Sequence, residues 1–153
     1  MLWTNTAFEL AVLIPILITG WQDYRTREAS NLITIPYFFI GVGVGIYRYH
    51  EDHSMWYVFL IQGLITLITW FNGMGGADWK MQCGLFGLHP LMGLVSVLAE
   101  GIWGAVLLLR HGPQARFPKL SVMALSSALT FLIDISIMPS IVQFLPGRIV
   151  PTA

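Results

Sequence analysis

Long apolar segments separated by short polar ones are the feature that most restricts how this chain can fold. A helix needs about 20 mostly apolar residues to cross a bilayer's hydrocarbon core, which is about 30 Å thick. Segments of about this length lie at residues 2–21, 32–49, 55–71, 91–110 and 120–138. Their number predicts an all-α membrane protein that crosses the bilayer several times. Gly41, Gly43 and Gly45 lie in the second segment, where small residues let helices approach closely.

The scarcity of charge supports this prediction. Apolar residues make up 56% of the 153 residues and charged residues 10%, whereas ordinary soluble domains have about 25% charged residues. A small soluble domain exposes much of its surface to water, so it needs more charge than this. The formal net charge is zero, which gives no indication of nucleic-acid binding. We therefore expect a single integral membrane domain over residues 1–153 with the lipid bilayer around it and no nucleic-acid partner.

The region from 78 to 110 is too long for one membrane span and contains a natural break at His89-Pro90. The residue before a proline avoids the helical conformation. We therefore divide the region into a short helix at 78–88, which follows the glycine-rich segment 72–77, and a full span at 91–110. The result is a polytopic bundle of about six transmembrane helices.

The distribution of basic residues supports this division. With the N-terminus outside, six basic residues fall on one side of the membrane: Arg25, Arg27, Lys80, Arg110, Arg116 and Lys119. Only Arg48 and Arg148 fall on the other side. Cytoplasmic loops carry an excess of Lys and Arg. The sequence therefore predicts a multi-pass protein of the cytoplasmic membrane, with the loops that contain Asp23 and Asp78 on the cytoplasmic side.

Asp23 and Asp78 occupy unusual positions. Asp23 lies two residues after the aromatic end of the first apolar segment, and Asp78 begins the short helix after the glycine-rich segment. Two carboxyl groups that share one proton can hydrolyse a peptide bond, since one activates a water as base and the other protonates the carbonyl oxygen as acid. Each feature also has an ordinary reading, because charges at span ends and glycine-rich loops between spans are common.

Both segments, in this order, resemble the motifs of the type IV prepilin peptidases. Residues 23–31, Asp-Tyr-Arg-Thr-Arg-Glu-Ala-Ser-Asn, are similar to the first motif, an Asp-x-Arg run that closes on Asn after the first helix of the peptidase domain. Residues 75–80, Gly-Gly-Ala-Asp-Trp-Lys, are similar to the second, Gly-x-Gly-Asp-x-Lys. The resemblance covers essentially the whole chain. It implies that Asp23 and Asp78 are catalytic, and we expect support from four further residues: Lys80, Gly75, Gly76 and Arg25.

Three departures from the family pattern refine this expectation. Ala29-Ser30 stands where the family usually has Ile-Pro, and Ala77 replaces the second glycine, a change that the preflagellin peptidase branch also shows. The cysteine-rich insert of the long, bifunctional members is missing, and the chain has one cysteine, Cys83. The resemblance therefore implies a short enzyme that cleaves the leader from a membrane-anchored prepilin-like or preflagellin-like precursor, without methyltransferase activity.

No metal or cofactor is expected, because one cysteine cannot build a zinc site of several thiolates and the four histidines are scattered. Cys83 itself is interpreted as a packing residue, since no histidine is placed to activate it. Lys80 is interpreted either as a partner that keeps Asp78 ionised or as a lysine that marks the cytoplasmic end of a span.

Glu100 leaves two interpretations open. It falls near the middle of the span at 91–110, where a charged side chain is costly and usually functional; the alternative is a protonated glutamic acid bonded to a neighbouring helix. Two other functions also stay open. One is a small proton-coupled transporter or channel subunit that uses Glu100 and Asp134, and the other is an inactive homologue that acts as a scaffold.

Overall fold

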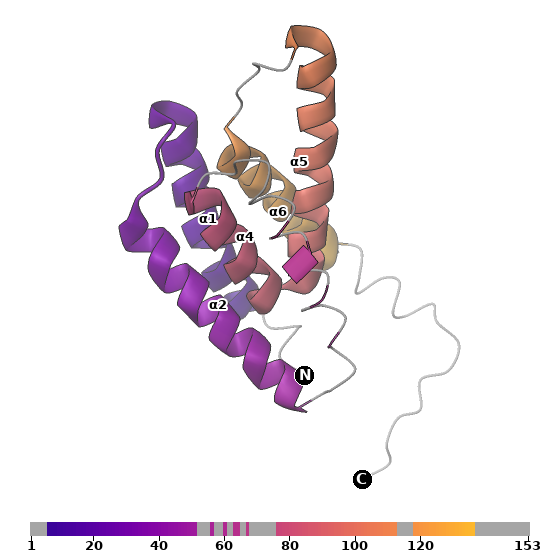
Figure 1. Cartoon of the computed structure of the whole chain (residues 1–153). Helices are drawn as coiled ribbons and strands as arrows, with labels where there is room; N and C mark the ends of the chain where they lie inside the picture. The colour runs from indigo at the N-terminus through magenta and orange to yellow at the C-terminus, as the bar shows by residue number, and fades with distance from the viewer. Residues whose placement is uncertain are drawn as a thin grey trace, which may run out of the picture.

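Five helices and no strands form the part of the chain that the computed structural model describes, residues 6–51, 76–112 and 118–136 with single residues between 56 and 67 (Figure 1). The helices are α1 (Thr6–Thr26), α2 (Asn31–Glu51), α4 (Gly76–Leu88), α5 (Pro90–His111) and α6 (Lys119–Ser136). The all-α class is confirmed for these residues. Most of the expected span at 55–71 lies outside the described residues. The tail beyond residue 136 lies entirely outside them.

The predicted break between α4 and α5 is confirmed. His89 caps α5, because its Nδ1 atom accepts a hydrogen bond from the Met92 amide at 3.2 Å. Pro90 occupies the first position of α5, where its missing N–H leaves no hydrogen bond unmade. At the other end of α5, Gly112 has a φ of 75° and its amide donates to the Leu108 carbonyl, a conformation that glycine adopts without strain.

Helix α1 extends further than the sequence suggested. The apolar segment was expected to end at Trp21, but the helix continues to Thr26. Asp23 therefore lies in the last turns of a helix and not in a polar loop after it. The helix ends where Arg27 takes a left-handed conformation with a φ of 59°. The Arg27 amide donates a hydrogen bond to the Asp23 carbonyl at 2.9 Å.

Ser30 starts the next helix. Its Oγ atom accepts a hydrogen bond from the Leu32 amide at 3.2 Å, as expected of a serine that precedes a helix. Its carbonyl accepts from the Ile33 and Thr34 amides. The serine that departs from the family pattern therefore has a local structural role, since it caps α2.

Glycines bring α2 and α4 into close contact. A Cβ atom on Gly41 would overlap the Gly84 backbone, and one on Gly87 would overlap the backbone of Gly41. The expected close approach is therefore confirmed for Gly41. It is wrong for Gly43, where an added Cβ would meet no atom of the described residues within 4 Å.

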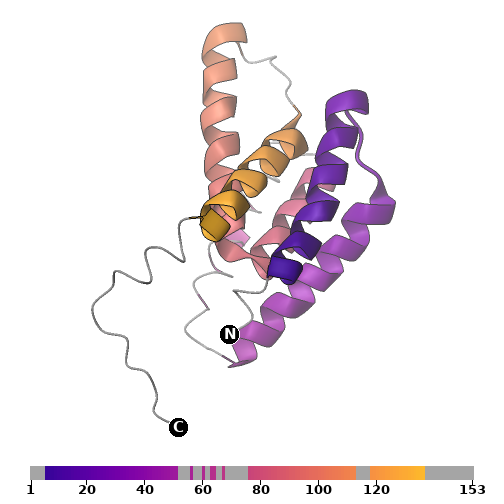
Figure 2. The same cartoon turned by 180° about the vertical axis from the view of Figure 1, so that it is seen from behind.

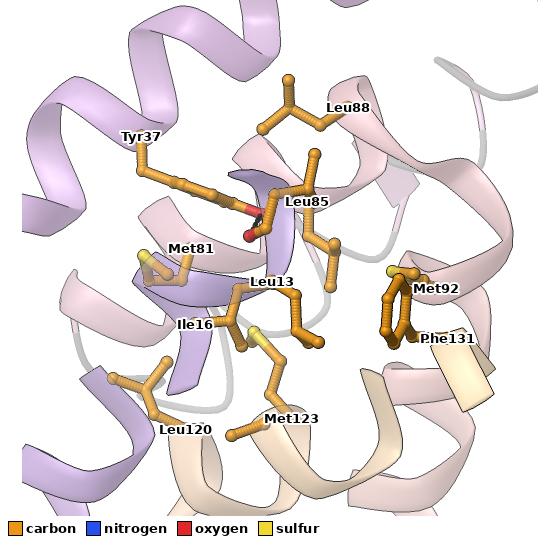
Figure 3. Close-up of a cluster of buried hydrophobic side chains, with 12 residues drawn as sticks. Leu13, Ile16, Tyr37, Met81, Leu85, Leu88, Met92, Leu120, Met123 and Phe131 are labelled. Atoms are coloured by element: carbon orange, nitrogen blue, oxygen red, sulfur yellow. Dashed lines mark hydrogen bonds between the residues drawn. The ribbon is translucent and has the colours of Figure 1, made fainter. Parts of the chain in front are cut away.

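The remaining helices pack around a shared core. Helix α1 packs mainly on α6, and α5 packs on both α6 and α4. All five described helices contribute side chains to the cluster in Figure 3, which includes Leu13, Ile16, Tyr37, Met81, Leu85, Leu88, Met92, Leu120, Met123 and Phe131. The Tyr37 hydroxyl also donates to the Val12 carbonyl at 3.3 Å, which joins α2 to α1.

One end of the bundle gathers most of the basic residues. The last residues of α1 and α5 and the first residues of α2, α4 and α6 lie at this end (Figures 1 and 2), which we call the site end. Arg25, Lys80, Arg110 and Lys119 belong to these helix termini. Arg48 lies at the opposite end, where its guanidinium donates to the Gly87 and Leu88 carbonyls at 3.0 and 2.6 Å. The side of the membrane on which each end of the bundle lies stays a prediction.

Two of the described helices are long and apolar enough to cross a membrane. These are α2 and α5, and α6 contains a shorter apolar stretch, Lys119–Ile133. The core helix of a soluble protein or a signal sequence passes the same test of length and composition. The described residues therefore contain two candidate spans, which do not support the expected bundle of about six transmembrane helices.

Candidate active site

Asp23 is fixed to the start of α6. Its carboxylate is buried, and Oδ2 accepts a hydrogen bond from the Leu120 amide at 3.0 Å. The Ser121 amide also acts on this carboxylate, and the Ser121 hydroxyl donates to the Gly20 carbonyl at 2.8 Å. The first amides of a helix have no partner within it. Asp23 therefore caps α6 from a different helix.

Burial raises the pKa of the Asp23 carboxyl group above its ordinary value, although the Leu120 and Ser121 amides and the Arg27 guanidinium each act to lower it. The effect of burial is the largest because removal of a carboxylate from water disfavours its charged form. Asp23 thus holds a proton more readily than an exposed aspartate does.

Asp78 lies in the first turn of α4 and is half-buried. It acts electrostatically on Glu100 of α5, and Lys119 of α6 acts on the same carboxyl group. Lys119 directly precedes the residue whose amide binds Asp23. The start of α6 therefore binds Asp23 through Leu120 and acts through Lys119 on Glu100, the acid on which Asp78 also acts.

Lys80 connects the two motifs. Its Nζ atom donates a hydrogen bond to Oδ1 of Asn31 at 2.9 Å, so the last residue of the second motif binds the last residue of the first. The structure places this lysine against the start of α2. The expected partnership with Asp78 stays a prediction.

The other expected supporting residues are placed differently. The Arg25 guanidinium lies 5.6 Å from the centre of the Trp21 ring, a cation–π contact, and the arginine that acts on Asp23 is Arg27. Gly76 is the first residue of α4, and an added Cβ there would meet nothing within 4 Å in the part of the chain that the structure describes. Gly75 lies outside the described residues.

Glu100 is buried in the middle of α5, with 9% of its surface exposed. Its Oε1 atom has no hydrogen-bond partner within the described part of the chain. One turn away along α5, Ser96 exchanges hydrogen bonds with Gln82 of α4 at 3.0 and 3.2 Å. The Gln82 amide also donates to the Gly93 carbonyl at 3.0 Å.

Sequence reasoning missed Gln82, Ser96 and Lys119 as members of this region. Gln82 follows Asp78 by four residues, and Ser96 precedes Glu100 by four, so each pair shares one helix face. Polar residues at this spacing in otherwise apolar helices were the available signal. Cys83 is buried, in agreement with its interpretation as a packing residue. Over the described residues, no group of three or more His, Cys, Asp or Glu side chains is placed to hold a metal ion.

The structure thus brings together Lys80 with Asn31 and Asp78 with Glu100, while Asp23 is bonded to α6. Asp23, Asn31, Asp78 and Lys80 belong to helix termini at the site end, whereas Glu100 lies in the middle of α5. With α6, these groups come from five helices. The arrangement can supply two carboxyl groups in different surroundings, one bonded to backbone amides and one beside a second acid. No protein-family model, curated protein or solved structure matches the chain.

Proposed function

We propose that this chain is a membrane aspartic endopeptidase that resembles the type IV prepilin peptidases and cleaves the leader from a prepilin-like or preflagellin-like precursor. The observation that carries the proposal is the hydrogen bond between Lys80 and Asn31. It joins the two segments on which the resemblance rests, although they are far apart in the sequence. Asp23 and Asp78 belong to these same two segments.

The surface of the helices supports a membrane location. Large apolar side chains are widely exposed, for example Leu32 at 84% and Leu109 at 87%. Only 28% of the most apolar stretch of α2 and 17% of that of α5 is buried, whereas the core helix of a soluble protein is mostly buried. Large exposed apolar surfaces indicate a membrane or protein interaction. The proposed location is the cytoplasmic membrane with the site end toward the cytoplasm.

The proposed reaction uses one water and both aspartates. Asp78 as the carboxylate removes a proton from the water, whose oxygen attacks the carbonyl carbon of the scissile peptide bond. Asp23 as the acid protonates the carbonyl oxygen. When the intermediate collapses, the C–N bond breaks and the leaving amine takes up the proton that Asp78 removed. Asp23 recovers a proton from one hydroxyl of the intermediate as the new carboxyl group forms, which restores both aspartates. The raised pKa of Asp23 supports its role as the acid. The substrate must lie between the start of α6 and the start of α4.

Leader cleavage tests the proposal directly. The full chain is expressed with a candidate prepilin, and loss of the leader is measured as a mass shift of the precursor. Asp78→Asn should abolish cleavage, because residues that act as a unit lose nearly all activity when one is removed. Glu28→Gln is the matched control, since Glu28 is an exposed acid of the first motif with no proposed role. Cleavage by Asp78→Asn within about tenfold of the wild type would contradict the mechanism.

Cysteine labelling tests the proposed orientation. Single cysteines at Thr26 and Gln114 in a Cys83→Ala background should react only from the cytoplasmic side, and a cysteine at Asp52 only from outside. Labelling of Thr26 and Gln114 from opposite sides would contradict the proposed crossing pattern.

A proton-coupled transporter or channel subunit is the second candidate function. The observation that favours it is the buried Glu100 carboxyl group with Asp78 beside it, since acids inside a membrane often carry protons. Proton uptake into liposomes that contain the purified protein, lost in Glu100→Gln, would support this candidate. An inactive scaffold would show neither proton uptake nor cleavage.

A further inference from the structure

Glu100 is the buried acid that the proposed reaction leaves without a role. A carboxylate taken out of water loses much favourable solvation, so a buried one is retained only where a partner or a function compensates. Its Oε1 atom has no hydrogen-bond partner among the described residues. The interpretation of Glu100 as a simple link to a neighbouring helix therefore does not account for this oxygen.

The packing of α4 against α5 places Glu100 beside Asp78. Gln82 and Ser96 bind each other in both directions, with distances of 3.0 and 3.2 Å, and this fixes the two helices in one register. Asp78 precedes Gln82 by one turn and Glu100 follows Ser96 by one turn. Because α4 and α5 run in opposite directions (Figure 1), these two steps lead to the same level of the bundle.

Charges from both neighbouring helices face Glu100. Helix α5 packs on α4 and α6, and the charged groups that act on Glu100 are Asp78 from α4 and Lys119 from α6. Two acids and one base at this position favour a single negative charge shared by the acids, since like charges at close range oppose the ionisation of both. The hydrogen bonds of Gln82 and Ser96 go to each other and to the Gly93 carbonyl, and none of these bonds involves Asp78 or Glu100.

We propose that Glu100 is a positioning residue of the candidate active site, which shares one proton with Asp78 and thereby sets the position and protonation of the Asp78 carboxyl group. This inference rests on the proposed function for its consequence in catalysis, but the coupling of the two acids is independent of that function. Lys119 holds the single negative charge of the pair near the start of α6. Glu100 acts through Asp78 and has no contact with the substrate.

Infrared spectroscopy tests the coupling without any assay of activity. The full chain in detergent is labelled with ¹³C in the glutamate carboxyl groups, so that glutamate and aspartate bands separate. A protonated-carboxyl band should disappear in Glu100→Gln and change its frequency in Asp78→Asn, because the neighbour of Glu100 has changed. Glu9→Gln is the matched control, since Glu9 is also a buried helical glutamate but lies near the start of α1. A Glu100 band that is unchanged in Asp78→Asn overturns the inference.

The pH dependence of leader cleavage tests the consequence for the site. Glu100→Gln keeps the size of the side chain and removes the acid that shares the single negative charge with Asp78, so the first ionisation at Asp78 should become harder. The acid limb of the pH–rate profile should move to higher pH by about 0.5 to 1 unit, with KM within about twofold of the wild type. Glu100→Asp should restore the position of the limb, and Glu9→Gln should leave it unmoved. A merely structural Glu100 would lower the unfolding temperature and leave the limb in place, which would overturn the inference.

The two measurements separate this inference from the proposed function. If the wild type cleaves no precursor, the proposed function fails, and the infrared result alone decides whether Glu100 and Asp78 are coupled. If the wild type cleaves but the infrared band is independent of Asp78, the inference fails and the proposed function stands.

Discussion

Substitution of Asp23 separates two roles that the structure and the sequence give to one side chain. Its Oδ2 atom caps α6 through the Leu120 amide at 3.0 Å, and the resemblance to prepilin peptidases implies a catalytic role that we propose for it. Asparagine at this position keeps a side-chain oxygen for the cap and cannot donate a carboxyl proton. Alanine loses both functions.

The size of the capping effect follows from the contact. Replacement of an aspartate cap by alanine costs about 1 kcal/mol, and up to about 2 kcal/mol in some proteins, whereas asparagine caps about as well as aspartate. In a chain of about 150 residues, a loss of 1 kcal/mol lowers the unfolding temperature by about 2 to 4 °C. Asp23→Ala should therefore unfold a few degrees below the wild type, and Asp23→Asn close to it.

Thermal unfolding in detergent and leader cleavage are measured on the same preparations. Both variants should lose cleavage by at least about 100-fold if Asp23 is catalytic, while only Asp23→Ala loses stability. Near-normal cleavage by Asp23→Asn would show that the carboxyl proton is not needed and that Asp23 serves only as a cap. An unfolding temperature of Asp23→Ala equal to that of the wild type would refute the capping argument.

The pH dependence of stability tests whether burial raises the pKa of Asp23 in the folded protein. Because burial raises the pKa of Asp23 in the folded protein, the folded chain binds this proton more tightly than the unfolded chain does. The resulting stabilisation is present below the unfolded pKa and is lost as the pH rises through the folded pKa. Asp23→Asn should therefore gain stability relative to the wild type when the pH is raised from about 4 to 7. A difference that does not change with pH would contradict the effect of burial.

Two further predictions concern the contacts of α4 with α2. Gly41→Ala should destabilise the protein by about 1 to 3 kcal/mol, because the new methyl group overlaps the Gly84 backbone. Gly43→Ala should be neutral or stabilising, because its methyl group meets no described atom within 4 Å. Equal unfolding temperatures for the two variants would refute the close packing. Lys80→Met should lower kcat/KM for leader cleavage by about 5- to 10-fold through loss of the bond to Asn31, and the double variant with Asn31→Ala should lose no more than the larger single effect. Additive losses would show that the two residues act separately.

The sequence predicted the fold where local chemistry decides it. The break between α4 and α5 follows from His89-Pro90, because proline restricts the residue before it, and the apolar segments predicted four of the five described helices. The end of α1 was placed too early, since the polar residues after Trp21 were taken to end the helix. A helix end depends on the conformation of single residues, here the left-handed Arg27, and apolar patterning carries no information about it.

The candidate site was predictable only as a set of residues. Asp23, Asp78 and Lys80 stood out by their motifs, but the motifs do not say which group each side chain binds. The bond of Asp23 to Leu120 depends on how α1 packs against α6, and that of Lys80 to Asn31 on how α2 packs against α4. The glycines of α2 show that the sequence likewise does not predict which small residue lies at a helix contact. Gly41 contacts α4, and composition alone could not distinguish it from Gly43.

The capping of α6 by Asp23 also has a consequence for synthesis of the protein in the cell. The partners of this hydrogen bond are 97 residues apart, and the ribosome adds about 5 to 20 residues per second. Leu120 is therefore made about 5 to 20 seconds after Asp23. Throughout this interval the Asp23 carboxylate has no α6 to cap. The surroundings of Asp23 are therefore complete only after the start of the last described helix has been made, and an unfinished chain lacks the assembled candidate site.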